Sequence, residues 1–277
     1  MVKPIPPRPR GADRSHALLK LNGKPQWSTW HKDGIDLIDG PPWQNPVVLQ
    51  SSSDHTALNI EAFLPPCGNN KVVGLAFNYK SLVGSRGQYE EPLVFLKGAN
   101  ALTGHASGIP MPVSKGRCWI EVELAIVLGR QARHVNVTEA AACIAGFTIA
   151  NDITTDNIQG RDHHLALSKS QDGFCPLGPW LVPDLDTANL NIKAFVDGNQ
   201  VQRGNTADRV CGDAQAVALA SRYFSLEAGD VIVTGTCSGW EGATFSAGAQ
   251  IAVEIEGLGT LENHILPAPV PQWSYLS

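Results

Sequence analysis

The sequence has few charged residues and no long apolar run. Charged side chains make up 17% of its 277 residues, and the formal net charge is only −5. Surfaces that bind nucleic acids or acidic membranes need clusters of Lys and Arg, so this composition argues against both partners. No apolar run approaches the length of a membrane span, and the first ten residues lack the apolar segment of a signal peptide. We therefore expect a cytoplasmic protein.

Paired cysteines and long helical patterns are also scarce. The six cysteines, at positions 67, 118, 143, 175, 211 and 237, are scattered without a C-x-x-C pair. This spacing indicates neither a zinc site nor a disulfide framework, so we expect reduced thiols. Gly and Pro are plentiful, with 27 and 19 residues, as is typical of short strands joined by turns. The sequence therefore predicts a β-rich α+β fold.

The chain is expected to divide near two adjacent prolines. Residues 1–66 are polar and rich in Pro, with short apolar segments at 17–21 and 47–49 that can form a small sheet or a packed arm. The two prolines close this part with a stiff, non-helical break. We predict a small N-terminal region over residues 1–66 and one larger domain over residues 67–277.

The segment at residues 120–129 has an unusual pattern. Its branched apolar residues and terminal Gly predict a strand, whose two-residue period places Glu121 and Glu123 on one face. Ala125 and Val127 continue that face, so two adjacent carboxylates would end an otherwise apolar row. A divalent cation bound through oxygens would relieve their repulsion. Taken alone, however, the segment is better explained by a solvent-facing edge strand that carries two ordinary charges.

A third carboxylate follows at the end of the next predicted strand. Asn136 can cap a helix with Glu139 at its third position, and this helix would end at Gly146. The strand at residues 147–150 then leads to Asp152. Because a helix between two short strands brings their ends together, Asp152 can reach the two glutamates. Three carboxylates without a Lys or Arg between them are hard to explain as a structural cluster, so the sequence now favours a metal site.

The remaining elements are predicted from local patterns. Residues 78–91 form a loop long enough to act as a lid, and the polar tract at residues 156–173 is either a wall of the site or an exposed loop. A hairpin turn is expected at residues 197–199 and an amphipathic helix at residues 213–224. Further strands are expected at residues 72–77, 93–97, 231–235 and 251–255.

One motif suggests a different chemistry. Gly235-Thr-Cys-Ser-Gly239 follows a predicted strand and has the form of a nucleophile elbow, with Cys237 as the candidate thiol. No helical pattern follows Gly239, however, and His264 is the one histidine downstream that could act as its base. A cysteine hydrolase is therefore a weaker hypothesis than a metal site.

Seven segments together resemble the fumarylacetoacetate hydrolase superfamily. They occur in the family's order and cover about residues 70–266: VGLAFNY from residue 73, EPLVFLK from 91, EVELAIVLG from 121, AGFTIAND from 145, KSQDGFCPLGP from 169, GDVIVTGT from 229 and VEIEGLGTL from 253. Within the superfamily, the sequence is most similar to enzymes that act as 2-hydroxyhepta-2,4-diene-1,7-dioate isomerase and 5-oxopent-3-ene-1,2,5-tricarboxylate decarboxylase.

The resemblance implies a mixed β-roll, usually a homodimer with a site in each subunit, and it makes the larger domain the catalytic one. It assigns Mg²⁺ or Mn²⁺ to Glu121, Glu123 and Asp152. Lys169 and Thr236 would be catalytic, Lys169 by neutralising anionic charge and Thr236 by donating a hydrogen bond. The substrate contacts that the resemblance implies are Asn78, Gln159, Lys169 and Thr236.

Substrates of this superfamily carry a 2-oxo acid or β-diketone unit, whose two oxygens can chelate a divalent cation. The cation, acting as a Lewis acid, would stabilise the enolate that forms when a C–C bond breaks or a proton moves. Hydrolysis, decarboxylation and isomerisation all pass through such an enolate. The metal site therefore does not select among these reactions.

The departures from the family's pattern bear on that choice. Leu82 and Ser85 occupy the positions of a His and a Glu that many relatives use as a lid dyad, so the usual general base is missing. Asp156 replaces a common Arg four residues after the metal-binding Asp. Residues that could supply a base from elsewhere are Glu90, Glu91 and His163. We therefore predict an isomerase or decarboxylase, with an acylpyruvate or fumarylacetoacetate hydrolase as the first alternative and a catalytically silent metal-binding homologue as the second.

Overall fold

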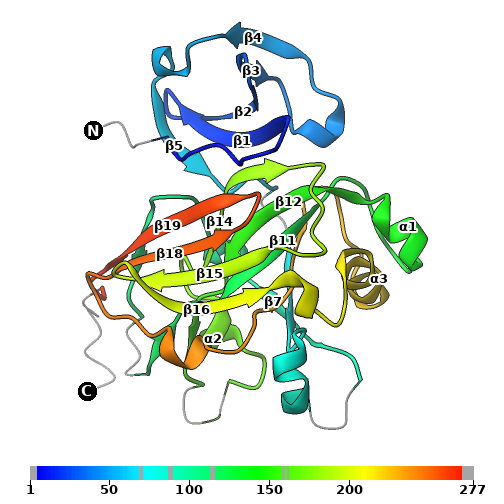
Figure 1. Ribbon diagram of the computed structural model, residues 1–277, viewed down its shortest axis with the longest axis vertical. Coiled ribbons are helices and arrows are strands. Elements are labelled where there is room, and N and C mark those ends of the chain that lie inside the picture. Colours follow the sequence, from blue (N-terminus) through cyan, green and yellow to red (C-terminus); the bar gives the residue numbers. More distant parts are fainter. Residues whose placement is uncertain are drawn as a thin grey trace, which may run out of the picture.

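A large mixed sheet runs from the N-terminal strands into the body of the molecule (Figure 1). The computed structural model describes residues 5–68, 71–86, 90–112, 116–157, 160 and 162–269. The large sheet contains, in spatial order, β4 (Val48–Ser52), β3 (Gly34–Ile38), β2 (Lys24–His31), β1 (Arg14–Leu21), β14 (Cys175–Val182), β12 (Ile144–Asn151), β11 (Val122–Leu128), β17 (Val231–Val233), β6 (Val72–Ala76) and β7 (Leu93–Lys97). Two strands join this path from the side, β5 (Ile60–Leu64) beside β1 and β8 (Leu102–Thr103) beside β14.

A second sheet lies in front of the body in Figure 1. Its strands, in spatial order, are β16 (Asn199–Asn205), β15 (Asn191–Val196), β18 (Gln250–Ile255), β19 (Gly259–Leu266) and β9 (Gly108–Pro110). A short ladder joins β10 (Cys118–Trp119) to β13 (Thr154–Thr155). The helices of the described residues are short: α1 (Val137–Ala141), α2 (Ala166–Lys169) and α3 (Asp213–Tyr223). The predicted β-rich α+β fold is confirmed.

The predicted hairpin and amphipathic helix are both present. Strands β15 and β16 are joined by a turn in which Asp197 and Gly198 have φ angles of 50° and 78°, the left-handed backbone that a tight hairpin requires. Helix α3 buries its apolar face, including Val217 and Ala220, against the body of the molecule. These two elements were predictable because their signals are local in the sequence.

Helix α1 is shorter than predicted. Asn136 and Glu139 form the expected capping box at its start, but the helix ends at Ala141. The chain is already in β12 at Ile144, which pairs with Leu128 of β11. Residues from Ile144 onwards, which the Ala-rich sequence alone assigns to the helix, therefore belong to strand β12.

Strands β1 to β5 form one end of the molecule, blue in Figure 1. A small apolar cluster lies among them and includes Leu19, Trp30 and Phe63. Trp180 of β14 packs edge-on against Trp30, with ring centroids 5.1 Å apart, and against Phe63 at 5.3 Å. The N-terminal strands are thus part of the large sheet and not a separate small one, and β14 supplies part of the core among them. The boundary at residue 66 stays a prediction.

His16 lies where the N-terminal strands join the rest of the sheet. It is opposite Leu181 in the ladder of β1 with β14, and its Nδ1 lies 3.0 Å from Thr29 Oγ1. Burial, with a smaller contribution from the charge of Arg14, lowers the pKa of His16 from 6.5 to about 4. The folded protein therefore holds this imidazole neutral at a pH where the unfolded chain already binds a proton.

We expect stability to fall in acid because of His16. Its contribution is complete above pH 6.5 and is lost as the pH falls towards 4, which amounts to about 3 kcal/mol. Urea unfolding of wild type and His16→Gln between pH 7 and pH 4 measures this loss as a difference in slope against pH. An exposed control, His163→Gln, should follow the wild-type curve. Parallel curves for wild type and His16→Gln would contradict the prediction.

Strand β11 lies in the interior of the large sheet, between β12 and β17. Every residue of β11 is buried, because its apolar side chains face packed layers on both sides. In the antiparallel ladder with β12, Glu123 is opposite Ala150. A solvent-facing edge strand, which residues 120–129 alone favour, is therefore wrong. Glu121 and Glu123 are buried carboxylates that need a compensating charge.

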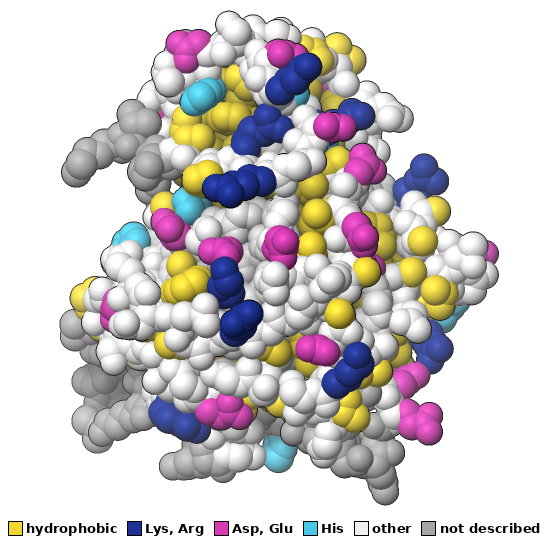
Figure 2. All heavy atoms as spheres, in the orientation of Figure 1, with side chains coloured by type: hydrophobic (Ala, Val, Ile, Leu, Met, Phe, Trp, Pro, Cys, Tyr) yellow, Lys and Arg dark blue, Asp and Glu magenta, His cyan; other side chains and the backbone are white. Residues whose placement is uncertain are grey.

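Charged side chains of both signs are mixed on the face drawn in Figure 2, without a large area of one sign. All six cysteines are free. In the described part of the chain, no helix is both long and apolar enough to cross a bilayer.

Candidate metal and substrate site

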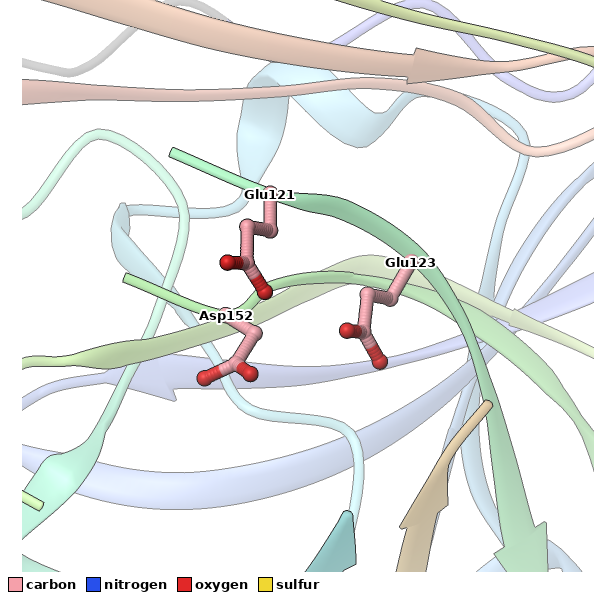
Figure 3. Close-up of side chains that lie close together, drawn as sticks. All are labelled: Glu121, Glu123 and Asp152. Carbon is pink, nitrogen blue, oxygen red and sulfur yellow. The ribbon is translucent and has the colours of Figure 1, made fainter. Parts of the chain in front are cut away.

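Glu121, Glu123 and Asp152 converge as the sequence predicts (Figure 3). Glu121 immediately precedes β11, Glu123 lies within it, and Asp152 immediately follows β12. Because Glu123 is opposite Ala150 in an antiparallel ladder, two further residues on each strand bring Glu121 opposite Asp152. The backbone N–H of Asp152 donates to Glu121 O at 2.9 Å. One carboxylate oxygen from each residue lies within 4.8 Å of the other two.

Two lysines lie against this cluster, so the expectation that no Lys or Arg accompanies it is wrong. Lys169, at the end of α2, donates from Nζ to Glu121 Oε2 at 3.0 Å and to Asp152 Oδ2 at 2.5 Å. Lys97, at the end of β7, donates to Asp152 Oδ1, and its side chain is fully buried. Both lysines come from segments distant in the sequence, which is why the local pattern around the carboxylates does not reveal them.

Glu123 is the least compensated of the three carboxylates. Burial raises its pKa well above the usual range, and the charges of Asp152 and Glu121 raise it further. Among the described residues, Glu123 accepts one hydrogen bond, from the backbone N–H of Gly235 at 2.7 Å. Burial also raises the pKa of Glu121, although the charge of Lys169 opposes this effect. The two glutamates therefore carry the unfavourable charge of the site.

Asp152 behaves in the opposite way. Burial favours its neutral form, but the charges of Lys169 and Lys97 outweigh burial and lower its pKa. Lys169 is also buried, yet the charges of Asp152 and the two glutamates hold its pKa above the ordinary value. Asp152 and Lys169 are thus an ionised pair inside the protein.

The donor set fits a hard divalent cation. An ion that binds oxygens at about 2.0–2.6 Å needs its ligand atoms within about 5 Å of one another, as the three carboxylate oxygens are. Three carboxylates and two ammonium groups leave a formal charge of −1, which Glu123 bears without a lysine hydrogen-bonded to it in the described structure. A cation placed among the three oxygens would compensate that charge.

Aromatic rings hold two members of the cluster in place. Trp119 Nε1 donates to Glu121 Oε1 at 2.6 Å, and the Trp119 ring packs on Trp240 with centroids 5.0 Å apart. The ring of Phe95 lies with its centroid 5.1 Å from Lys169 Nζ, where an ammonium group is attracted to the ring face. These contacts fix the directions of one carboxylate and one ammonium group.

Sequence reasoning did not assign Lys97, Trp119 or Phe95 to the site. Lys97 gives a weak signal in the sequence, because it is a charge that ends an otherwise apolar strand, β7. Trp119 and Phe95 give no such signal, since buried aromatic residues are common in any core. Their relation to the carboxylates depends on the three-dimensional arrangement alone.

Thr236 lies just after β17 and beside β11. Its hydroxyl donates to Val122 O at 2.9 Å and accepts from Gln202 Nε2 at 2.9 Å. The preceding residue, Gly235, is the one whose N–H binds Glu123. Thr236 is thus adjacent to the carboxylate cluster through the backbone. Gln159, another substrate contact implied by the resemblance, lies outside the described residues.

Asn78 is fully buried and joins two backbone segments. Its Nδ2 donates to Thr234 O at 2.9 Å and to Cys211 O at 3.0 Å. Its Oδ1 accepts from the backbone N–H of Cys211 at 2.8 Å. The side chain therefore connects the start of the 78–91 loop to the segment that carries Thr236.

Leu82, at the lid position of the usual base, and the candidate bases Glu91 and His163 have other surroundings. Leu82 lies in the 3₁₀ helix Lys80–Arg86 and is not ionisable. Glu91 accepts from Arg222 Nη1 at 2.6 Å and from Tyr223 OH at 3.1 Å, which ties it to α3. His163 is exposed. None of these three described residues hydrogen-bonds to the carboxylate cluster.

Asp156 and Ser85 are the other departures from the family's pattern. Asp156 accepts from Arg117 Nε at 3.2 Å and from Arg117 Nη2 at 3.0 Å. These hydrogen bonds lower the pKa of the Asp156 carboxyl. Asp156 is therefore an ionised partner of Arg117. The side chain of Ser85 lies outside the part of the structure that is described.

Cys237 does not have the surroundings of a nucleophile. Burial raises the pKa of its thiol to about 11, whereas catalytic cysteines have lowered pKa values. Gly239 is followed by a 3₁₀ helix, Trp240–Gly242, and not by the α-helix of a nucleophile elbow. We therefore expect Cys237→Ser to keep kcat/KM within about twofold of wild type, because the thiol takes no part in bond making. A loss of more than about 100-fold, in a variant with unchanged melting temperature, would restore the thiol hypothesis.

Similarity to known proteins agrees with this arrangement. The family described as Fumarylacetoacetate (FAA) hydrolase C-terminal matches residues 71–266. The homoprotocatechuate catabolism bifunctional isomerase/decarboxylase of Escherichia coli is 34% identical over 235 residues, which are 83% of this chain and 54% of that protein. The chain thus spans about half the length of this relative.

Two solved structures share the fold. That of 2-hydroxyhepta-2,4-diene-1,7-dioate isomerase from Mycobacterium marinum has a TM-score of 0.81 and 28% sequence identity, over 91% of this chain and 98% of that one. Maleylpyruvate hydrolase from Sphingobium sp. SYK-6, solved in complex with manganese(II) and pyruvate, has a TM-score of 0.71 and 22% identity, over 91% and 100%. The chain therefore belongs to the fumarylacetoacetate hydrolase family of enzymes.

Proposed function

We propose that the protein is a divalent-metal-dependent isomerase or decarboxylase of an enolisable 2-oxo acid, of the 2-hydroxyhepta-2,4-diene-1,7-dioate type. The observation that carries this proposal is the buried cluster of Glu121, Glu123 and Asp152 with two lysines beside it. The relationship to the isomerase/decarboxylase of E. coli and the isomerase of M. marinum supports the substrate class.

Glu121, Glu123 and Asp152 would hold Mg²⁺ or Mn²⁺, both of which accept carboxylate oxygens. When bound, the ion would supply a Lewis acid that stabilises the negative charge of an enolate. Two added positive charges change the formal charge of the cluster from −1 to +1. A site with this charge favours an anionic acid over a neutral ligand.

The two lysines would have different tasks. Lys97 is fully buried and donates to Asp152 and, at 3.4 Å, to Ile153 O, so it is committed to the protein. Lys169 is slightly exposed at its side chain and donates to Glu121, to Asp152 and, at 2.7 Å, to Thr154 Oγ1. We assign Lys169, through its positive charge, to the substrate carboxylate or to the charge that develops on the substrate. Lys97 helps Lys169 to hold Asp152 ionised.

The other proposed contacts follow from the positions of their segments. Thr236, beside the carboxylates, and Gln159 would bind the substrate. Asn78 would act by joining the 78–91 loop to the Thr236 segment, because its amide atoms are already hydrogen-bonded to the backbone. By its family, the protein would be a cytoplasmic homodimer, which sedimentation of the purified protein would test.

Isomerisation and decarboxylation need no activated water, whereas C–C hydrolysis does. Leu82 offers no ionisable group at the lid position, and Glu91 is held by Arg222 and Tyr223 of α3. The favoured reactions are therefore those in which a proton moves or CO₂ leaves.

The test is turnover of 2-hydroxyhepta-2,4-diene-1,7-dioate, oxaloacetate and an acylpyruvate by purified protein with Mg²⁺, Mn²⁺ or EDTA. We expect an EDTA-sensitive tautomer shift or release of CO₂. Cleavage of the acylpyruvate to two acids would establish a hydrolase instead. Bound metal without any turnover would mean a catalytically silent homologue.

A further inference from the structure

The hydroxyl of Thr236 has one hydrogen, and that hydrogen is already used. It is donated to Val122 O at 2.9 Å, so the backbone of β11 holds the hydroxyl in one orientation. One of the two lone pairs of Thr236 Oγ1 accepts from Gln202 Nε2, also at 2.9 Å. A hydroxyl offers one donor and two acceptor positions. A single lone pair therefore remains, and any further hydrogen bond to this oxygen must be accepted by it.

Gln202 of β16 is buried and enforces this arrangement. Its Nε2 donates to Cys237 O at 2.8 Å in addition to Thr236, which uses both amide hydrogens. Its Oε1 faces the backbone N–H of Val122 at 3.3 Å. If the amide were rotated by 180°, its oxygen would face the carbonyl oxygen of Cys237 and its NH₂ group would face the N–H of Val122. Only the observed orientation therefore pairs each donor with an acceptor.

We infer that Gln202 is a positioning residue that fixes Thr236 as a hydrogen-bond acceptor, so the site recognises a hydroxyl hydrogen on its ligand. This inference rests on the proposed function and adds to it the tautomer that is bound. The C2 oxygen of a 2-oxo acid has no hydrogen to donate, whereas that of the 2-hydroxy, enolic form has one. Thr236 supplies the acceptor that the hydroxyl of the enol requires.

Pyruvate and lactate test whether Thr236 accepts a hydrogen bond from the ligand, because they share a carbon skeleton and differ in whether the C2 oxygen carries a hydrogen. Their affinities for the Mg²⁺-loaded protein are measured by calorimetry, with both enantiomers of lactate. We expect Thr236→Val to lower the affinity for the better-bound enantiomer of lactate by about tenfold and the affinity for pyruvate by less than about twofold. Thr236→Ser, which keeps the hydroxyl, should restore the wild-type ratio of the two affinities. Melting temperature controls for folding.

Gln202→Met, which matches the length of Gln202 but removes its amide, should reduce the lactate to pyruvate ratio towards that of Thr236→Val. Equal weakening of both ligands by Thr236→Val, or stronger weakening of pyruvate, would overturn the inference and leave the proposed function intact. An unchanged ratio of lactate affinity to pyruvate affinity in a folded Gln202→Met protein would show that Gln202 does not position Thr236. If wild-type protein binds neither ligand but turns over the heptadienedioate, the inference is overturned and the proposed function stands.

Discussion

A Glu123→Gln variant is expected to lose metal-dependent turnover by about 10³-fold, and its metal-free form is expected to melt at a higher temperature than wild type. The loss follows because Lewis-acid stabilisation of an enolate is worth several kcal/mol, and Glu123 is a proposed ligand of the cation. The gain follows because burial and two neighbouring carboxylates raise the pKa of Glu123. A neutral amide of the same shape removes that repulsion and can still accept from Gly235.

The measurements are kcat/KM with saturating Mg²⁺ and thermal melting with EDTA. Glu254→Gln is a matched control, since Glu254 binds Lys193 at 2.8 Å in a partly exposed pair. It should change neither quantity appreciably. Normal turnover in Glu123→Gln would show that the carboxylate cluster is not the metal site. A lower melting temperature without metal would show that Glu123 stabilises the fold by itself.

Lys97→Met is expected to destabilise the metal-free protein by about 3–5 kcal/mol, the usual cost of removing one partner of a buried ion pair. Lys97 and Asp152 are both fully buried at their side chains, so water cannot replace the lost ammonium group. Urea unfolding in EDTA measures the effect. The double variant Lys97→Met/Asp152→Asn should recover much of the loss, because it returns the formal charge of the cluster to the wild-type value of −1.

Lys80→Met is the control for this prediction. Lys80 lies 3.9 Å from Asp208 in a pair whose side chains are more than half exposed, and such a pair contributes at most about 1 kcal/mol. Equal destabilisation by Lys97→Met and Lys80→Met would contradict the assignment of Lys97 as an essential counter-charge. Lys97→Met should also lower turnover, since Asp152 would keep only one of the two ammonium groups that lower its pKa.

The convergence of Glu121, Glu123 and Asp152 was predictable because it depends on local rules. A strand period places the two glutamates on one face, and a short connection returns the chain in an antiparallel neighbour. The observed register, with Glu123 opposite Ala150, follows from the same alternation. The family resemblance then added Lys169 and Thr236, which no local pattern assigns to this site.

What could not be predicted is how the strand order brings other segments to the carboxylates. The path from β12 through β11, β17 and β6 to β7 is not the order of the sequence. Lys97 reaches Asp152 across 55 residues. Burial of β11 on both faces depends on that same arrangement. The edge-strand interpretation and the expected lack of a lysine were wrong for this one reason.

The two lysines have a consequence for how the enzyme would be loaded. Lys97 and Lys169 bring their own positive charges to Asp152 and Glu121. The protein itself therefore compensates part of the repulsion among the carboxylates, in addition to any ion that binds there. Unlike a zinc finger, whose chain unfolds on chelation, this protein should stay folded when a chelator removes the ion. One divalent ion could then be exchanged for another by dialysis, without refolding the chain.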